Sequence, residues 1–147
     1  MLLASASVMT VTGCGASTGD GSTPDALTAA LSAAAGAEVH LSRAVSGTWT
    51  RVLFVCPYAD EKYVQKMLGF AWEDFPGPDM TEGRVTFVFA TDSEVVTWAT
   101  VSRRLGDPCS GPTPPPNPTG KKSAVYRVVR TNTTVDGTPF YSLVPKG

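Results

Sequence analysis

The apolar residues of this chain gather in short runs that have the periodicities of strands and short helices. Within residues 47–56, the run Val52–Val55 is unbroken and consists of branched and aromatic side chains. Such a run is typical of a strand that is covered on both faces. Residues 84–91 alternate instead, which predicts a strand with one apolar face made of Val85, Phe87 and Phe89.

The alternating strand is expected to form a hairpin with residues 94–102, joined by a tight turn at Asp92 and Ser93. In a regular strand, a period of two places Val96, Trp98 and Thr100 on one face. Two more strands are expected at 123–131 and 140–144, with Asp136-Gly137 turning the chain between them. A weaker apolar pattern over 39–45 indicates a strand before the central one.

Two short helices are predicted from apolar spacing and end signals. The first follows Thr23 as N-cap and stops before Gly36. The second covers 61–68, with Asp60 as N-cap and Gly69 as the left-handed end. The order of elements favours an α+β domain, in which an antiparallel sheet of about five strands carries the two short helices on one face.

The domain is expected to span residues 25–147, a length that supports one hydrophobic core. Residues 106–120 contain six prolines and predict a long Pro-rich loop inside it. Residues 14–24 are mostly Gly, Ser and Thr, a composition that buries little apolar surface and predicts a flexible tether.

Residues 1–13 are uncharged and apolar, too few to span a bilayer but suited to the core of a signal peptide. The next residue is Cys14, and Val11-Thr12-Gly13-Cys14 resembles the lipobox of bacterial lipoproteins. In that class the thiol receives a diacylglyceryl group and the chain is cut before it. The resemblance implies a lipid anchor on Cys14 and a location on the extracytoplasmic face of the cell membrane. The alternative is an apolar tail with a chance match.

The chain has three cysteines, so an anchor on Cys14 leaves Cys56 and Cys109 as an even pair. Such pairs form disulfides in oxidising compartments. We therefore expect a bridge between them, which would stabilise the fold by about 4 kcal/mol in the chain-entropy model. The alternative is two free thiols.

Charge and motif content exclude several functions. Twelve basic against thirteen acidic residues give a net charge of −1, which gives no electrostatic reason to expect nucleic acid as a partner. His40 is the single histidine, so no multi-histidine metal site is expected, and no cofactor motif is visible. Glu73, Asp74, Asp79 and Glu82 lack calcium-loop spacing and are interpreted as a solvated acidic loop.

Surface recognition is one class of function that stays open, and four residues are candidates for a binding face. Trp72 and Phe75 flank acidic residues beside a Pro-Gly loop, which favours exposed aromatic side chains. Arg103 and Arg104 would add a basic strip next to them, together with Arg127 and Arg130 on a later strand.

The segments Cys56-Pro57-Tyr58 and Leu68-Gly69-Phe70-x-Trp72 loosely resemble small uncharacterised lipoproteins of actinobacteria, a resemblance that implies no activity. We expect a membrane-anchored, non-catalytic module that binds an envelope protein, peptide or glycan. The alternative is a small envelope hydrolase in which the fold gathers carboxylates such as Asp60, Glu73 and Asp74 with His40.

Overall fold

A computed structural model of the protein describes residues 22–111 and 113–147. The predicted signal peptide at 1–13, the lipobox cysteine Cys14 and most of the predicted tether lie outside the described residues. The helices are α1 (Ser22–Ala33), α2 (Leu41–Ala44) and α3 (Glu61–Leu68), with single 3-10 turns at Arg103–Leu105 and Lys121–Ser123. The strands are β1 (Glu38–His40), β2 (Arg51–Val55), β3 (Arg84–Ala90), β4 (Val95–Ser102), β5 (Thr119–Gly120), β6 (Val125–Val135) and β7 (Thr138–Pro145).

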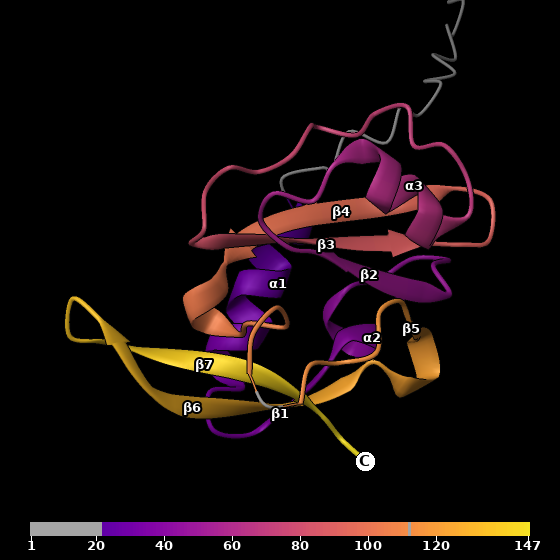
Figure 1. Ribbon diagram of the computed structural model, residues 1–147. Coiled ribbons are helices and arrows are strands. Elements are labelled where there is room, and N and C mark those ends of the chain that lie inside the picture. The colour runs from indigo at the N-terminus through magenta and orange to yellow at the C-terminus, as the bar shows by residue number, and fades with distance from the viewer. Residues whose placement is uncertain (1–21, 112) are drawn as a thin grey trace, which may run out of the picture.

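The strands form two antiparallel sheets, which lie one above the other in Figure 1. The larger has the order β4-β3-β2-β5 and the smaller the order β1-β6-β7. The α+β class with antiparallel pairing is thus confirmed. The single sheet of about five strands is replaced by two, because the two segments that follow the Pro-rich loop pair with each other and with β1, and not with the hairpin.

The main core fills the space between the two sheets. Alternation on β3 sends Val85, Phe87 and Phe89 into this core, as predicted, while smaller side chains point to the other face. Edge-to-face ring contacts order its centre, with Phe54 5.0 Å from Phe87 and 5.7 Å from Tyr126 of the opposite sheet. Helix α1 closes one side by burying Leu27 and Leu31.

Helix α3 lies on the outer face of the larger sheet, so the helices do not share one face as the sequence suggested. Asp60 accepts a hydrogen bond from the backbone N–H of Tyr63 at 2.8 Å, and Gly69 ends the helix with φ of +82°. Its buried side chains, Val64 and Leu68, cover an apolar outer face that the central strand β2 shares. This double coverage explains the unbroken apolar run of β2.

The start of helix α1 differs from the prediction. The helix begins by Ser22, so Thr23 lies inside it and is not its N-cap, and residues 22–24 of the predicted tether are helical.

Two further local predictions need correction. A β-bulge between β3 and β4 leaves Val96 unpaired, because Phe89 pairs with Thr97 and Ala90 with Val95. Val96 therefore packs toward the main core, whereas Trp98 packs on the outer face. The strand expected over 39–45 ends at His40, because the chain then turns into helix α2.

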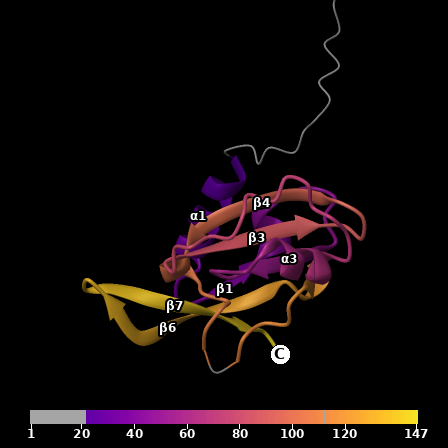
Figure 2. The same ribbon diagram turned by 45° about the horizontal axis from the view of Figure 1, so that its top comes forward.

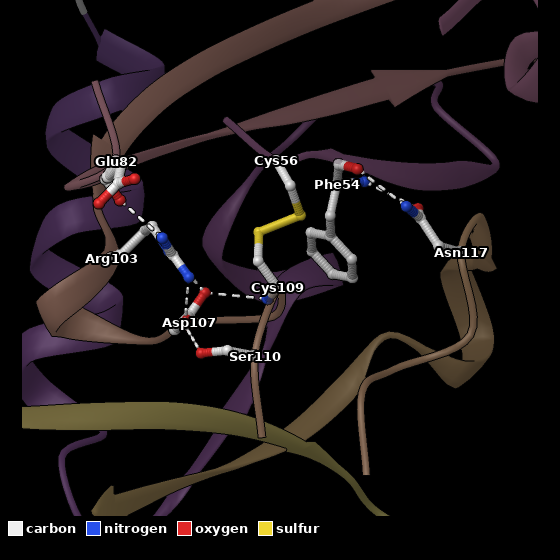
Figure 3. Close-up of a disulfide and its surroundings, with 8 residues drawn as sticks. All are labelled: Phe54, Cys56, Glu82, Arg103, Asp107, Cys109, Ser110 and Asn117. Carbon is white, nitrogen blue, oxygen red and sulfur yellow. Dashed lines mark hydrogen bonds and ion pairs between the residues drawn. A yellow bond between two sulfur atoms is a disulfide. The ribbon is translucent and has the colours of Figure 1, made fainter. Parts of the chain in front are cut away.

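The Pro-rich loop, which ends in β5, covers the edge of β2 that does not pair with β3. Strand β5 pairs with only a short part of this edge. Farther along the same edge of β2, the side chain of Asn117 makes the backbone hydrogen bonds that a neighbouring strand would make (Figure 3). Its Oδ1 accepts a hydrogen bond from the N–H of Phe54 at 2.9 Å, and its Nδ2 donates to the C=O of Phe54 at 2.8 Å. One side chain thus satisfies both backbone groups of a buried strand residue.

Strands β6 and β7 form a long hairpin whose tip extends away from the larger sheet in Figures 1 and 2. Asp136 and Gly137 make its turn with φ of +52° and +74°, which confirms the predicted turn.

Gly106, in the segment after β4, lies close against the side chains of the main core. A Cβ added here would lie 2.9 Å from Cδ2 of Leu143 and 3.3 Å from Cδ2 of Leu31, although its φ of 175° suits any residue. We predict that Gly106→Ala lowers the free energy of unfolding by about 1–3 kcal/mol through overpacking. Gly120→Ala is the matched control, because a Cβ there meets nothing within 4 Å. Urea denaturation measures both, and equal stabilities would contradict the prediction.

Candidate functional site

The predicted Cys56–Cys109 disulfide is present. The Cα atoms are 5.8 Å apart, within the usual range for a bridge. Cys56 directly follows β2, and Cys109 lies near the start of the Pro-rich loop (Figure 3). The bridge therefore ties that loop to the central strand of the larger sheet.

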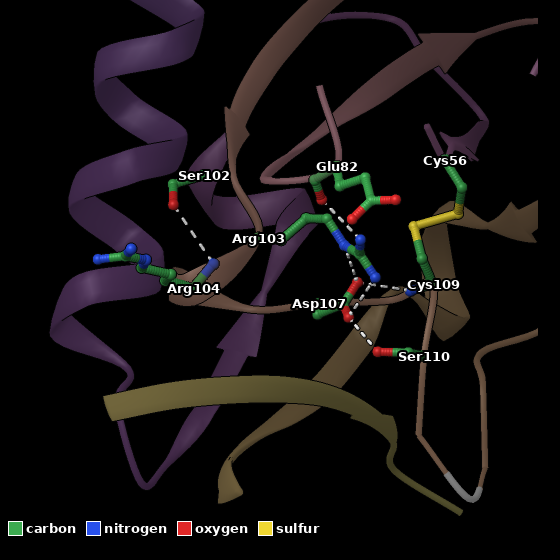
Figure 4. A network of polar contacts seen from close by, with 8 residues as sticks. All are labelled: Cys56, Glu82, Ser102, Arg103, Arg104, Asp107, Cys109 and Ser110. Atoms are coloured by element: carbon green, nitrogen blue, oxygen red, sulfur yellow. Dashed lines mark hydrogen bonds and ion pairs between the residues drawn. A yellow bond between two sulfur atoms is a disulfide. The ribbon is translucent and has the colours of Figure 1, made fainter. Parts of the chain in front are cut away.

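A buried ion pair lies beside the disulfide (Figure 4). The guanidinium of Arg103 donates to both carboxylate oxygens of Asp107, at 3.0 Å from Nε and 2.9 Å from Nη2. Asp107 is fully buried, and its carboxylate also accepts from the backbone N–H of Cys109 and the hydroxyl of Ser110. These donors satisfy the charge that burial would otherwise make costly.

The backbone of Asp107 binds the smaller sheet. Its N–H donates to the C=O of Tyr141 at 2.9 Å, and its C=O accepts from the N–H of Leu143 at 3.0 Å. These bonds create a parallel bridge to Ser142 on β7. Asp107 therefore joins the end of the larger sheet to the smaller one.

The four predicted binding-face residues do not form one exposed surface. The guanidinium of Arg103 is turned inward to Asp107, and its side chain is 18% exposed. Arg104 points elsewhere and pairs with Asp136 of the β6–β7 turn at 3.6 Å. Trp72 was expected to be exposed, but its exposed fraction is 5%.

Trp72 is buried on the outer face of the larger sheet, in the same apolar cluster as Val64 and Leu68 of helix α3. The segment after the helix lays the indole of Trp72 against that of Trp98, with the ring centroids 5.9 Å apart. The ring of Phe75 packs 5.6 Å away and is half-buried. These aromatic residues extend the outer core and do not form a free surface.

A cleft of about 410 Å³ lies on the outer face next to this aromatic cluster. Loop residues 76–80 form one wall, and the β3–β4 hairpin forms the other through Arg84, Thr86, Trp98 and Thr100. We call it the loop cleft. Its size falls within the range of about 300–1,000 Å³ that is common for small-molecule sites.

The loop cleft combines an aromatic surface with paired polar groups. Trp98 is partly exposed, and the hydroxyls of Thr86 and Thr100 are hydrogen-bonded to each other at 2.7 Å. At the rim, Oδ2 of Asp79 pairs with Nε of Arg84 at 3.2 Å. No sequence motif marks these residues, because loop and hairpin come together only in the fold.

Asp79 keeps its charge because the folded loop stabilises the carboxylate. The backbone N–H of Thr81 donates to it at 2.8 Å, and with the ion pair to Arg84 this lowers the pKa of Asp79 below its ordinary value. The neighbouring Glu82 accepts a hydrogen bond from the hydroxyl of Tyr58 at 3.1 Å. Both acidic residues therefore hold the loop in place.

The residues proposed for a hydrolase lie in different parts of the described structure. His40 is on β1 of the smaller sheet, 3.7 Å from Glu38. Asp60 caps helix α3 on the outer face of the larger sheet, and Glu73 and Asp74 are exposed in the following turn. The fold does not bring His40 together with these carboxylates.

No protein-family model, curated protein or solved structure matches this chain. Among the described residues, none of the helices has the length and apolar character needed to cross a bilayer.

The two neighbouring arginines allow a matched test of the buried pair. We predict that Arg103→Gln lowers the free energy of unfolding by about 3–5 kcal/mol, because it leaves the buried charge of Asp107 without its partner. Arg104→Gln removes an exposed pair and should cost less than about 1 kcal/mol. Chemical denaturation of both variants measures the difference. Similar losses of stability in the two variants would mean that Arg103 is not needed to stabilise the buried carboxylate of Asp107.

The lowered pKa of Asp79 predicts a dependence of stability on acid. The folded state favours the ionised carboxylate of Asp79. Its contribution to the free energy of unfolding is therefore complete above the ordinary pKa of 3.8, and it is lost as the pH falls through the lower pKa of the folded state. The stability difference between the wild type and Asp79→Asn should therefore shrink below pH 3.8. Urea titrations across this range measure it, and a constant difference would contradict the assignment.

Proposed function

We propose that this protein is exported, carries a lipid on Cys14 and acts as a non-catalytic binding module at the outer face of a membrane. The observation that carries the proposal is the Cys56–Cys109 disulfide. Disulfides persist in oxidising compartments and are rare in the cytosol. The bridge also uses two of the three cysteines, which leaves Cys14 for the lipid.

The length of the sequence between Cys14 and helix α1 suits an anchor. Seven residues, 15–21, separate the two. A chain of that length spans at most about 25 Å, which would keep the domain close to the membrane surface. The ligand of such a module would be a component of the envelope.

The loop cleft supports binding as the activity. It is a concave surface with an aromatic ring and a few polar groups on a paired hairpin, the arrangement that small-ligand sites commonly have. Because regular backbone pairing holds β3 and β4, these groups are already in position before a ligand arrives.

The intact mass of the protein from its own membrane fraction tests the anchor and the compartment together. We expect the loss of residues 1–13, a gain of one diacylglyceryl group, and a gain of two hydrogens on reduction of the disulfide. A Cys14→Ser control should lack the lipid and still gain the two hydrogens. An unprocessed chain with three free thiols would overturn the proposal.

A further inference from the structure

We propose that the loop cleft holds a sugar ring, so that the ligand of this module is an uncharged glycan. This inference rests on the proposed function in one respect, the assumption that the domain is a binding module. It rests on three features that line one cavity: the indole of Trp98, the hydrogen-bonded hydroxyls of two threonines, and an ion pair that has no net charge.

Trp98 supplies a surface for the C–H face of a sugar. Aromatic rings carry partial negative charge on their faces, which attracts the weakly positive C–H groups of a pyranose. The edge-to-face contact with the buried Trp72 fixes the Trp98 indole, which is itself only partly covered. Little side-chain freedom is therefore lost when a ligand binds.

Thr86 and Thr100 match the hydroxyl groups of a sugar. In their mutual hydrogen bond, one hydroxyl donates and the other accepts. The accepting hydroxyl still has its own hydrogen to donate, and both oxygens retain lone pairs. Neighbouring sugar hydroxyls offer the same mixture of donors and acceptors.

Asp79 and Arg84 extend this pattern to the rim without adding net charge. The carboxylate accepts hydrogen bonds and the guanidinium donates them. Because they pair at 3.2 Å, their charges offset each other, and the cleft has no excess cation to favour a phosphate or carboxylate ligand. The chemistry therefore favours a neutral polyhydroxylated ligand.

A peptide is the less favoured ligand because the cleft presents no free strand edge. Peptides that add to a sheet need a row of unpaired backbone groups. Here β3 and β4 pair with each other along the cleft, from Arg84 opposite Ser102 to Val88 opposite Trp98. Strand β3 also pairs with β2 on its other side. Strand β4 is an edge strand, but its unpaired edge points away from β3, whereas the cleft lies on the face of the hairpin.

Binding of defined glycans to the full chain in detergent tests the inference. The probes are an array of microbial and plant oligosaccharides, with a pool of extended peptides for comparison. The indole N–H signal of Trp98, assigned with Trp98→Phe, reports occupation of the cleft. We expect at least one oligosaccharide to shift this signal, and Thr100→Val and Arg84→Gln each to weaken its binding by about five- to tenfold.

Thr97→Val is the matched control, because it removes a hydroxyl from the same strand outside the cleft, where it bonds to Thr23. This variant should bind the glycan as the wild type does. The inference is overturned if no glycan shifts Trp98, if the cleft variants bind normally, or if only peptides shift the signal. The mass measurement separates the two proposals, since a lipidated chain without glycan binding refutes this inference alone.

Discussion

The carboxylate of Asp107 is buried completely in this protein, and the junction between the two sheets is built around it. A buried charge is tolerated only when donors surround it, and here they come from the end of β4 and from the loop that follows it. The backbone of the same residue pairs with β7. Asp107 thus binds the neighbouring turn and loop through its carboxylate and the smaller sheet through its backbone.

The same junction also supports the loop cleft on the other side of the larger sheet. Arg103, which neutralises Asp107, donates through Nη1 to the C=O of Glu82, and its backbone N–H donates to the C=O of Gly83. The same loop is also held where the N–H of Tyr58 donates to the C=O of Asp79. One wall of the cleft is therefore fixed by residues that also organise the disulfide region.

Local patterns in the sequence were sufficient for the elements whose signals lie within a few residues of one another. Helix α3 begins after Asp60 and ends before Gly69, as predicted, because a cap and a left-handed glycine act on adjacent backbone groups. The continuous run of β2 and the alternation of β3 correctly indicated burial. The disulfide followed from the number of cysteines and their expected compartment.

Features that depend on distant segments were decided only by the tertiary structure. The sequence could not show that the last two strands form a second sheet, since pairing partners are chosen by packing across the whole chain. It placed Trp72 on the surface, because the ring that it packs against, Trp98, lies on a strand that comes later in the chain. The inward turn of Arg103 and the loop cleft have the same origin, since their partners meet only after folding.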